Sequence, residues 1–335
     1  MRCHNLSDKD AVTKDYIKQP VQFADLFNGF CFDGEEIIHP EDLQEMDTTG
    51  IVLPYGSDGA TLPEQKTRDV LKSLLKTDGK AAYCILGVEN QSEIHNAMAV
   101  RNMLYDAITL AGQVEKTARS YRKAHDYGAN QREFLSGFHL GDKVLPVITI
   151  VLHWGTDVWD APLSLHDMYP ADMNPKILKY AADYKVNLVS PATMTDEQLD
   201  IFRSDLREVL KFIKHSDNKE ALMDLVNRNH KYQNLDKLAA QAISVCTNVD
   251  FKVPDGEELV DVCKAIEDIK DEGRDEGRVE GREEERHNTA VRMIKAGKLS
   301  LEEIAEYLAL PLANVKEIKK SLTQTSQVLS TRKAL

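Results

Sequence analysis

Two acidic residues and one amide lie at the ends of neighbouring apolar segments, where together they could bind a divalent metal ion. Asp69 begins the segment 69–75, and Glu89 and Gln91 lie at the end of the segment that starts at residue 81. Side chains two residues apart on a strand point to the same face, so Glu89 and Gln91 share a face. Mg²⁺ prefers oxygen ligands, typically one or two carboxylates with water and phosphate. Such a site favours phosphodiester hydrolysis, because the metal offsets phosphate charge and activates water.

The two segments have the pattern of paired strands. Residues 69–75 and 81–90 are separated by Thr77-Asp78-Gly79, which is typical of a hairpin turn. The second segment is apolar throughout residues 82–88, as expected of a strand buried on both faces. Acidic residues are common at strand ends, so the spacing by itself is also compatible with a purely structural role.

Further segments complete an α/β pattern. A short helix is predicted around residues 21–30, among polar loops, and a long helix follows from Met98, with apolar residues at helical spacing. Residues 144–152 and 186–189 read as strands, and helices are expected at roughly 195–215, 218–229 and 235–248. This order predicts an α/β core of mixed sheet and flanking helices, with a helical cap.

The residues around the acidic pair resemble a known family. The runs Arg68-Asp69-Val70-Leu71 and Leu86-Gly87-Val88-Glu89-Asn90-Gln91-Ser92, followed by Met98-x-x-Arg101-x-x-x-Tyr105, are similar to the pattern of the Rpn recombination-promoting nucleases and transposases of the PD-(D/E)XK superfamily. Residues 23–28 resemble the opening helix of that family. The resemblance covers most of residues 12–280, and its most specific element is Glu-x-Gln-Ser.

The resemblance implies a restriction-endonuclease-like core and a metal-dependent DNA endonuclease, acting in recombination, transposition or defence against mobile elements. It implies that Asp69 and Glu89 hold Mg²⁺, or another divalent cation such as Mn²⁺ or Ca²⁺, with assistance from Asp25. Gln91 would orient the attacking water. Two further residues, Arg101 and Tyr105, are expected to contact the DNA phosphate, although both could instead pack beside the strand.

Two departures from the superfamily pattern leave a second function open. Gln91 occupies the position where the superfamily has Lys, and an amide cannot take a proton from water. No Pro precedes Asp69. The Gln is usual within the Rpn family, and the Pro position is degenerate in the superfamily. The alternative is a non-catalytic DNA-binding or interaction protein that keeps the nuclease fold. An enzyme acting on RNA is a third possibility.

Charge and composition set limits on partners and location. The formal net charge of −13 argues mildly against nucleic acid, although residues 116–132 are locally basic and could face phosphate or simply be solvated. The five Cys residues are scattered without a CxxC pair, which argues against a zinc site or a disulfide framework. The sequence shows no membrane-spanning run or signal peptide, and we therefore expect a cytoplasmic location.

The chain changes character towards its C-terminus. We predict a nuclease-like core over 1–192, a helical cap over 193–255, a charged linker helix with Glu-Gly-Arg repeats over 256–290, and a small two-helix unit over 291–335. Glycine weakens the repeat helix, so it is expected to be marginal alone and to act as a linker or associate weakly with a copy of itself. The two-helix unit has a capping box at Ser300 and Glu303 and the size of a helix-turn-helix, and it is expected to dock on a second protomer or on DNA.

Overall fold

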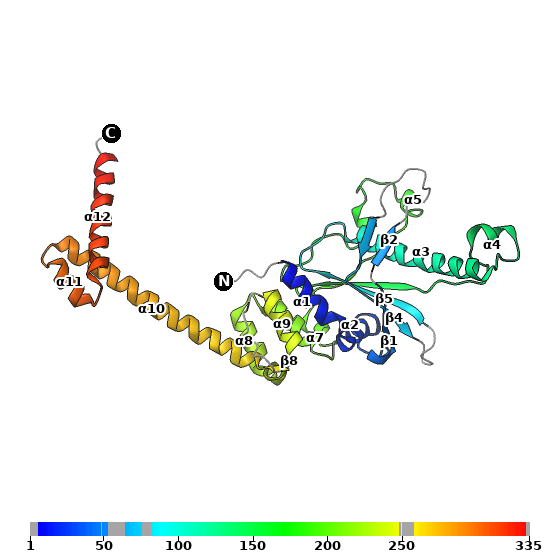
Figure 1. Ribbon diagram of the computed structural model, residues 1–335, viewed down its shortest axis with the longest axis horizontal. Coiled ribbons are helices and arrows are strands. Elements are labelled where there is room, and N and C mark those ends of the chain that lie inside the picture. Colours follow the sequence, from blue (N-terminus) through cyan, green and yellow to red (C-terminus); the bar gives the residue numbers. More distant parts are fainter. Residues whose placement is uncertain are drawn as a thin grey trace. The chain divides into compact units, whose positions relative to one another are not determined.

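The computed structural model describes residues 6–47, 49–52, 64–75, 82–247, 249 and 258–332 (Figure 1). The chain forms two compact units, Met1–Cys263 and Lys264–Leu335. The expected core and helical cap therefore belong to one unit. The turn predicted at residues 77–79 lies outside the described residues.

A five-stranded mixed sheet is the centre of the first unit. Its order is β1 (Leu43–Glu45), β4 (Val70–Leu75), β5 (Ala82–Gln91), β6 (Val147–His153) and β7 (Asn187–Val189). The pairs β1–β4 and β4–β5 are antiparallel, whereas β5–β6 and β6–β7 are parallel. This open mixed sheet with flanking helices confirms the predicted α/β class and is consistent with a restriction-endonuclease-like core.

Helices cover the central strands. Residues 84–91 of β5 are all buried, as the apolar run at 82–88 predicts for most of the strand. Helix α1 (Leu6–Lys18) packs against β4 and β5, and α3 (Met98–Ala124) packs against β6 and runs on beyond the sheet towards α4 (Gln131–Ser136) (Figure 1). Helix α1 was not predicted, because its buried face uses few apolar residues, among them Tyr16 and Ile17.

The helical part of the first unit packs around α1. Helix α9 (Lys237–Thr247) lies against both α1 and α7 (Leu206–His215), and α2 (Pro20–Phe32) also contacts α7. The predicted helix at 195–215 is in fact two helices, because the chain breaks between α6 (Asp196–Leu199) and α7. The remaining elements of this unit are β2 (Thr49–Val52), β3 (Glu64–Thr67), α5 (Pro175–Leu178), α8 (Lys219–Arg228), β8 (Leu235–Asp236), β9 (Leu259–Val260), and the short 3₁₀ turns Pro40–Asp42, His166–Met168 and His230–Gln233.

Three helices account for the C-terminal part of the chain. Helix α10 (Val262–Ala296) is continuous through the Glu-Gly-Arg repeats, and α11 (Leu301–Leu308) and α12 (Leu312–Arg332) follow it. The capping box predicted at the start of α11 is present, since Ser300 Oγ accepts from Glu303 N and Glu303 Oε2 accepts from Ser300 N. In the described part of the chain, no helix combines the length and the apolar character needed to cross a membrane.

Candidate active site

The antiparallel register of β4 and β5 brings the two predicted acidic residues together. Val70 pairs with Val88 at the end of the ladder, so Asp69 and Glu89 face each other one residue further on. Asp69 Oδ2 accepts a hydrogen bond from the backbone N–H of Asn90 at 2.9 Å, which fixes this carboxylate beside the end of β5. The hairpin therefore places both carboxylates at one edge of the sheet, as the spacing predicted.

Glu89 is fully buried and only partly satisfied. Its Oε1 accepts from Arg68 Nε at 3.2 Å, whereas its Oε2 accepts no hydrogen bond from any described residue. Burial, and then the neighbouring charge of Asp69, raise the pKa of Glu89 to about 7. Burial also raises the pKa of Asp69. A buried carboxylate oxygen without a donor, next to a second carboxylate, is the arrangement that a bound cation would complete.

A buried charged network lies behind Glu89. Arg68 is 4% exposed and joins Glu89 to Asp106 of α3, whose Oδ1 lies 3.0 Å from Arg68 Nη2. Thr149 of β6 donates to the same Asp106 oxygen at 2.6 Å and accepts from Arg68 Nη2. Tyr184 donates to Asp106 Oδ2 at 2.6 Å. Arg68 lies between β3 and β4 and is thereby held by α3 and β6, so it can hold Glu89 in one position.

Arg101 and Tyr105 lie on the face of α3 that approaches Glu89. Arg101 Nη2 is 3.8 Å from Glu89 Oε2, and its side chain is 34% exposed, so it can reach a ligand at the edge of the sheet. Tyr105 is buried, its hydroxyl accepts from Arg101 Nε at 3.4 Å, and the guanidinium groups of Arg68 and Arg101 both lie 5.6 Å from its ring centroid. Of the two residues, Arg101 is thus available to substrate, whereas Tyr105 supports both arginines.

Gln91 ends β5 two residues after Glu89. It is 7% exposed, and its Nε2 donates to the carbonyl of its neighbour Asn90 at 2.8 Å. The backbone carbonyl of Gln91 accepts from Trp154 N at 2.9 Å, and Trp154 Nε1 donates to Asn90 Oδ1 at 2.9 Å. The side-chain amide of Gln91 is therefore held by its neighbour in the chain, and it offers no group that could accept a proton at neutral pH.

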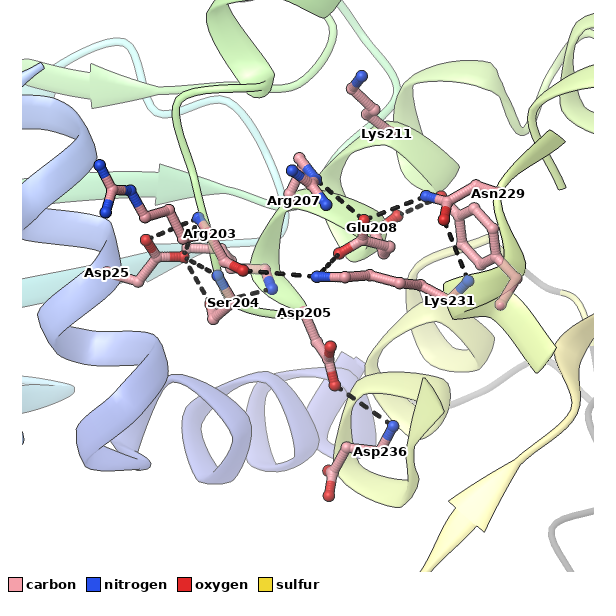
Figure 2. Close-up of polar contacts among 12 residues, drawn as sticks. Asp25, Arg203, Ser204, Asp205, Arg207, Glu208, Lys211, Asn229, Lys231 and Asp236 are labelled. Carbon is pink, nitrogen blue, oxygen red and sulfur yellow. Dashed lines mark hydrogen bonds and ion pairs between the residues drawn. The ribbon is translucent and has the colours of Figure 1, made fainter. Parts of the chain in front are cut away.

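The carboxylate of Asp25 has its hydrogen-bond partners in the helical part of the first unit. Figure 2 shows its carboxylate pointing from α2 to the turn before α7. Its oxygens accept from Arg203 N at 2.9 and 3.1 Å, from Ser204 N at 2.8 Å and from Ser204 Oγ at 2.6 Å. These amides lie where the predicted single helix is interrupted. Asp25 therefore joins α2 to the start of α7, and its carboxylate already has hydrogen-bond partners without a metal.

A second fully buried glutamate, Glu208, lies in the helical part of the first unit (Figure 2). Glu208 Oε1 accepts from Arg207 Nε at 2.9 Å and from Asn229 Nδ2 at 3.1 Å, and its Oε2 lies 3.7 Å from Lys231 Nζ. Like Glu89, it has an Oε2 without a hydrogen bond from the described residues. It also pairs with two cations, as Glu89 does, but Arg207 and Lys231 are both partly exposed whereas Arg68 is buried, so Glu208 offers a matched control for Glu89.

Sequence reasoning missed the contribution of α1. Asp10 of α1 accepts from Ser92 Oγ at 2.8 Å, and the charges of Asp10 and Lys14 both act on Asp69. No motif marks these two residues, because they come near the site only when α1 packs on β4 and β5. Within the described ranges, no three His, Cys, Asp or Glu side chains gather closely enough to hold a metal ion by themselves.

The family model described as "Putative transposase, YhgA-like" matches residues 60–242, which is more than half of the chain. The chain belongs to this family. The YhgA-like match confirms the predicted resemblance to the Rpn nuclease and transposase group. It also supports a role related to transposition, a process that involves DNA. No curated protein and no solved structure matches the chain.

The YhgA-like match covers Asp69 and Glu89, the acidic edge of the sheet at the ends of β4 and β5, but it does not cover the flanking parts of the chain. Asp69, Glu89, Gln91, Arg101 and Tyr105 all lie within residues 60–242. Helices α1 and α2 precede the match, and α10 to α12 follow it. The C-terminal unit is therefore an addition to the part of the chain that defines the YhgA-like family.

Proposed function

We propose that the protein is a metal-dependent DNA endonuclease that acts in transposition or recombination. The observation that carries this proposal is the buried Oε2 of Glu89, which has no hydrogen bond from the described residues and lies beside Asp69. Retaining such a group costs stability unless a ligand satisfies it. A metal-binding site would explain why the chain keeps this oxygen. A site of that kind suits transposition, which requires cleavage of DNA.

The residues present fit a magnesium ion. Asp69 and Glu89 supply two carboxylates, and Mg²⁺ usually takes one or two carboxylates and completes its shell with water and substrate phosphate. When bound, the ion would offset charge on the phosphate and lower the pKa of an attacking water. Mn²⁺ and Ca²⁺ have the same preference for oxygen, so each is a candidate for the same two residues.

Other residues of the chain position these groups and the substrate. Arg101 is partly exposed beside Glu89, so we expect it to contact the scissile phosphate. Arg68 keeps the Glu89 carboxylate directed to the edge of the sheet. Gln91 can orient water or phosphate by hydrogen bonding, but it is no general base. We therefore expect activation of water to depend on the metal.

A plasmid assay separates catalysis from binding alone. Purified protein is incubated with supercoiled plasmid and with single-stranded DNA, in Mg²⁺, Mn²⁺, Ca²⁺ or EDTA. Nicking or linearisation that requires the metal supports the endonuclease. The rival is a non-catalytic DNA-binding protein, which Gln91 favours because an amide cannot act as a general base. Binding without cleavage in every metal would establish the rival, and no binding would contradict both.

Glu89 makes stability depend on pH and on metal. Its pKa is about 7 in the folded protein and near 4.5 when exposed. Between these values the unfolded state has lost a proton that the folded state keeps, so the free energy of unfolding falls as pH rises. Added Mg²⁺ should raise the melting temperature at about pH 8, where the carboxylate is ionised, more than at about pH 5.

The measurement is thermal unfolding with EDTA or Mg²⁺ at both pH values. Glu89→Gln removes the titrating group, so it should lose both the pH trend in this window and the metal response. Glu208→Gln is the matched control and should keep both. A parent protein that is equally stabilised by Mg²⁺ at the two pH values would show that Glu89 is not the titrating ligand.

Replacing Gln91 tests the missing base. In Gln91→Lys, an amine stands where the wider superfamily has lysine, so we expect cleavage to be retained or to rise. Gln91→Leu has a similar size without polar atoms and should lower the rate if the amide orients water. Initial rates on plasmid in Mg²⁺ measure both. If the lysine variant folds normally and is inactive, the amide makes a contact that an amine cannot replace.

A further inference from the structure

The C-terminal unit contains a small core of its own. The last turns of α10 contribute Ala290, and α11 and α12 contribute Ile304, Ala305, Val315 and Ile318. Partly buried side chains complete the core, namely Val291, Met293, Ile294, Leu301, Leu308, Leu310, Leu312 and Leu322. Three helices thus pack around one apolar centre, which holds α12 firmly against α11.

The connection between α11 and α12 has the form of a helix-turn-helix. The capping box fixes the start of α11 at Ser300, and Ala309 ends it with a left-handed backbone, φ 50°. Three residues, 309–311, separate the two helices, and Pro311 directly precedes α12. A turn of three or four residues between packed helices is characteristic of the DNA-binding motif, in which the second helix enters the major groove.

The outer face of α12 has a net positive charge, since exposed Lys316 and Lys320 outnumber exposed Glu317. Val315 and Ile318 point into the core, whereas Lys316 and Lys320 are exposed. These lysines are four residues apart, so they lie one above the other on the same face of the helix. That face points away from the core and presents two positive charges about one helical turn apart.

Charge is distributed unevenly within this unit, whose first part, residues 264–286, contains six Lys and Arg against ten Glu and Asp. Residues 287–335 contain eight Lys and Arg against four Glu and Asp, whereas the whole chain has a net charge of −13. Three of these four acidic residues, Glu302, Glu303 and Glu306, lie on α11. The excess positive charge is therefore carried by α12 and by the end of α10, which is the distribution expected when the second helix meets phosphate.

We propose that α11 and α12 form a helix-turn-helix that binds duplex DNA through the Lys316 and Lys320 face of α12. This inference goes beyond the proposed nuclease activity and does not depend on it. The bound ligand is the phosphate backbone and major groove of a double helix. The C-terminal unit would thus provide a second contact with DNA, separate from the acidic edge of the sheet.

Binding by the full chain tests the proposal. The probe is a labelled mixed-sequence duplex of about 20 base pairs, two turns of DNA, and anisotropy is measured in EDTA so that no cleavage occurs. Lys316→Glu/Lys320→Glu should weaken binding about tenfold or more and reduce the slope of log affinity against log salt by about two. Lys316→Arg/Lys320→Arg keeps the charge and should bind like the parent protein.

Matched controls separate this contact from general electrostatics and from the nuclease site. Lys176→Glu/Lys179→Glu makes the same charge change at exposed positions of the first unit and should leave affinity within about twofold. Asp69→Asn should retain the effect of the α12 variant, whether or not the protein cuts DNA. Equal affinity of the two Lys→Glu double variants would overturn the proposal. The proposal would also be overturned if Lys316→Glu/Lys320→Glu had a lower mass by light scattering and an unchanged affinity for DNA. The α12 face would then join two copies of the chain.

Discussion

Asp69→Asn and Glu89→Gln are each expected to lower metal-dependent cleavage by about 100-fold or more, because each removes one of two carboxylate ligands and several kcal/mol of transition-state stabilisation. The amide substitutions keep the shape of each side chain. They are preferable to alanine at Glu89, where a smaller residue would leave Arg68 without its partner. Initial rates of plasmid nicking in Mg²⁺, and Mg²⁺ affinity by calorimetry, measure the two consequences separately.

The chain supplies a matched control for each variant. Asp25→Asn repeats the change at a buried aspartate that holds the turn at 203–204, and Glu208→Gln repeats it at a glutamate that is equally buried. Both controls should cut DNA at the parent's rate per folded molecule. If the controls lose as much activity as Asp69→Asn and Glu89→Gln, the loss reflects damaged packing and the active site has been misplaced.

Arg68→Met is expected to destabilise the fold by about 3–5 kcal/mol, because it leaves Glu89 and Asp106 buried without their shared cation. Urea unfolding in EDTA measures this loss. The double variant Arg68→Met/Glu89→Gln should recover part of it, since the amide removes one of the stranded charges. Mg²⁺ should also protect the single variant, because a bound cation replaces part of the lost charge.

Arg207→Met is the corresponding control. Arg207 pairs with Glu208 as Arg68 pairs with Glu89, but its side chain is 26% exposed, and Glu208 keeps Lys231 and Asn229. Its loss should therefore cost clearly less than the loss of Arg68. Equal destabilisation by the two Met substitutions, with no recovery in the double variant, would show that Arg68 contributes packing rather than charge.

Much of the candidate site could be predicted from the sequence because it depends on local structure. A two-stranded hairpin brings the start of its first strand near the end of its second, so it places Asp69 near Glu89, and period two places Gln91 on the Glu89 face. Helical spacing likewise brings Arg101 and Tyr105 together on α3. The capping box at Ser300 could also be predicted, since Ser300 and Glu303 are only three residues apart.

Contacts between residues far apart in the chain were decided only by the tertiary structure. Thr149 and Tyr184 reach Asp106 through the packing of α3, β6 and the segment before β7, and no spacing rule predicts such a meeting. The same holds for Asp25, whose partners at 203–204 lie far along the chain. The sequence by itself determined which carboxylates stand at the strand ends. The surrounding fold decided which of them is buried, because burial and charge pairing depend on every element that packs around a group.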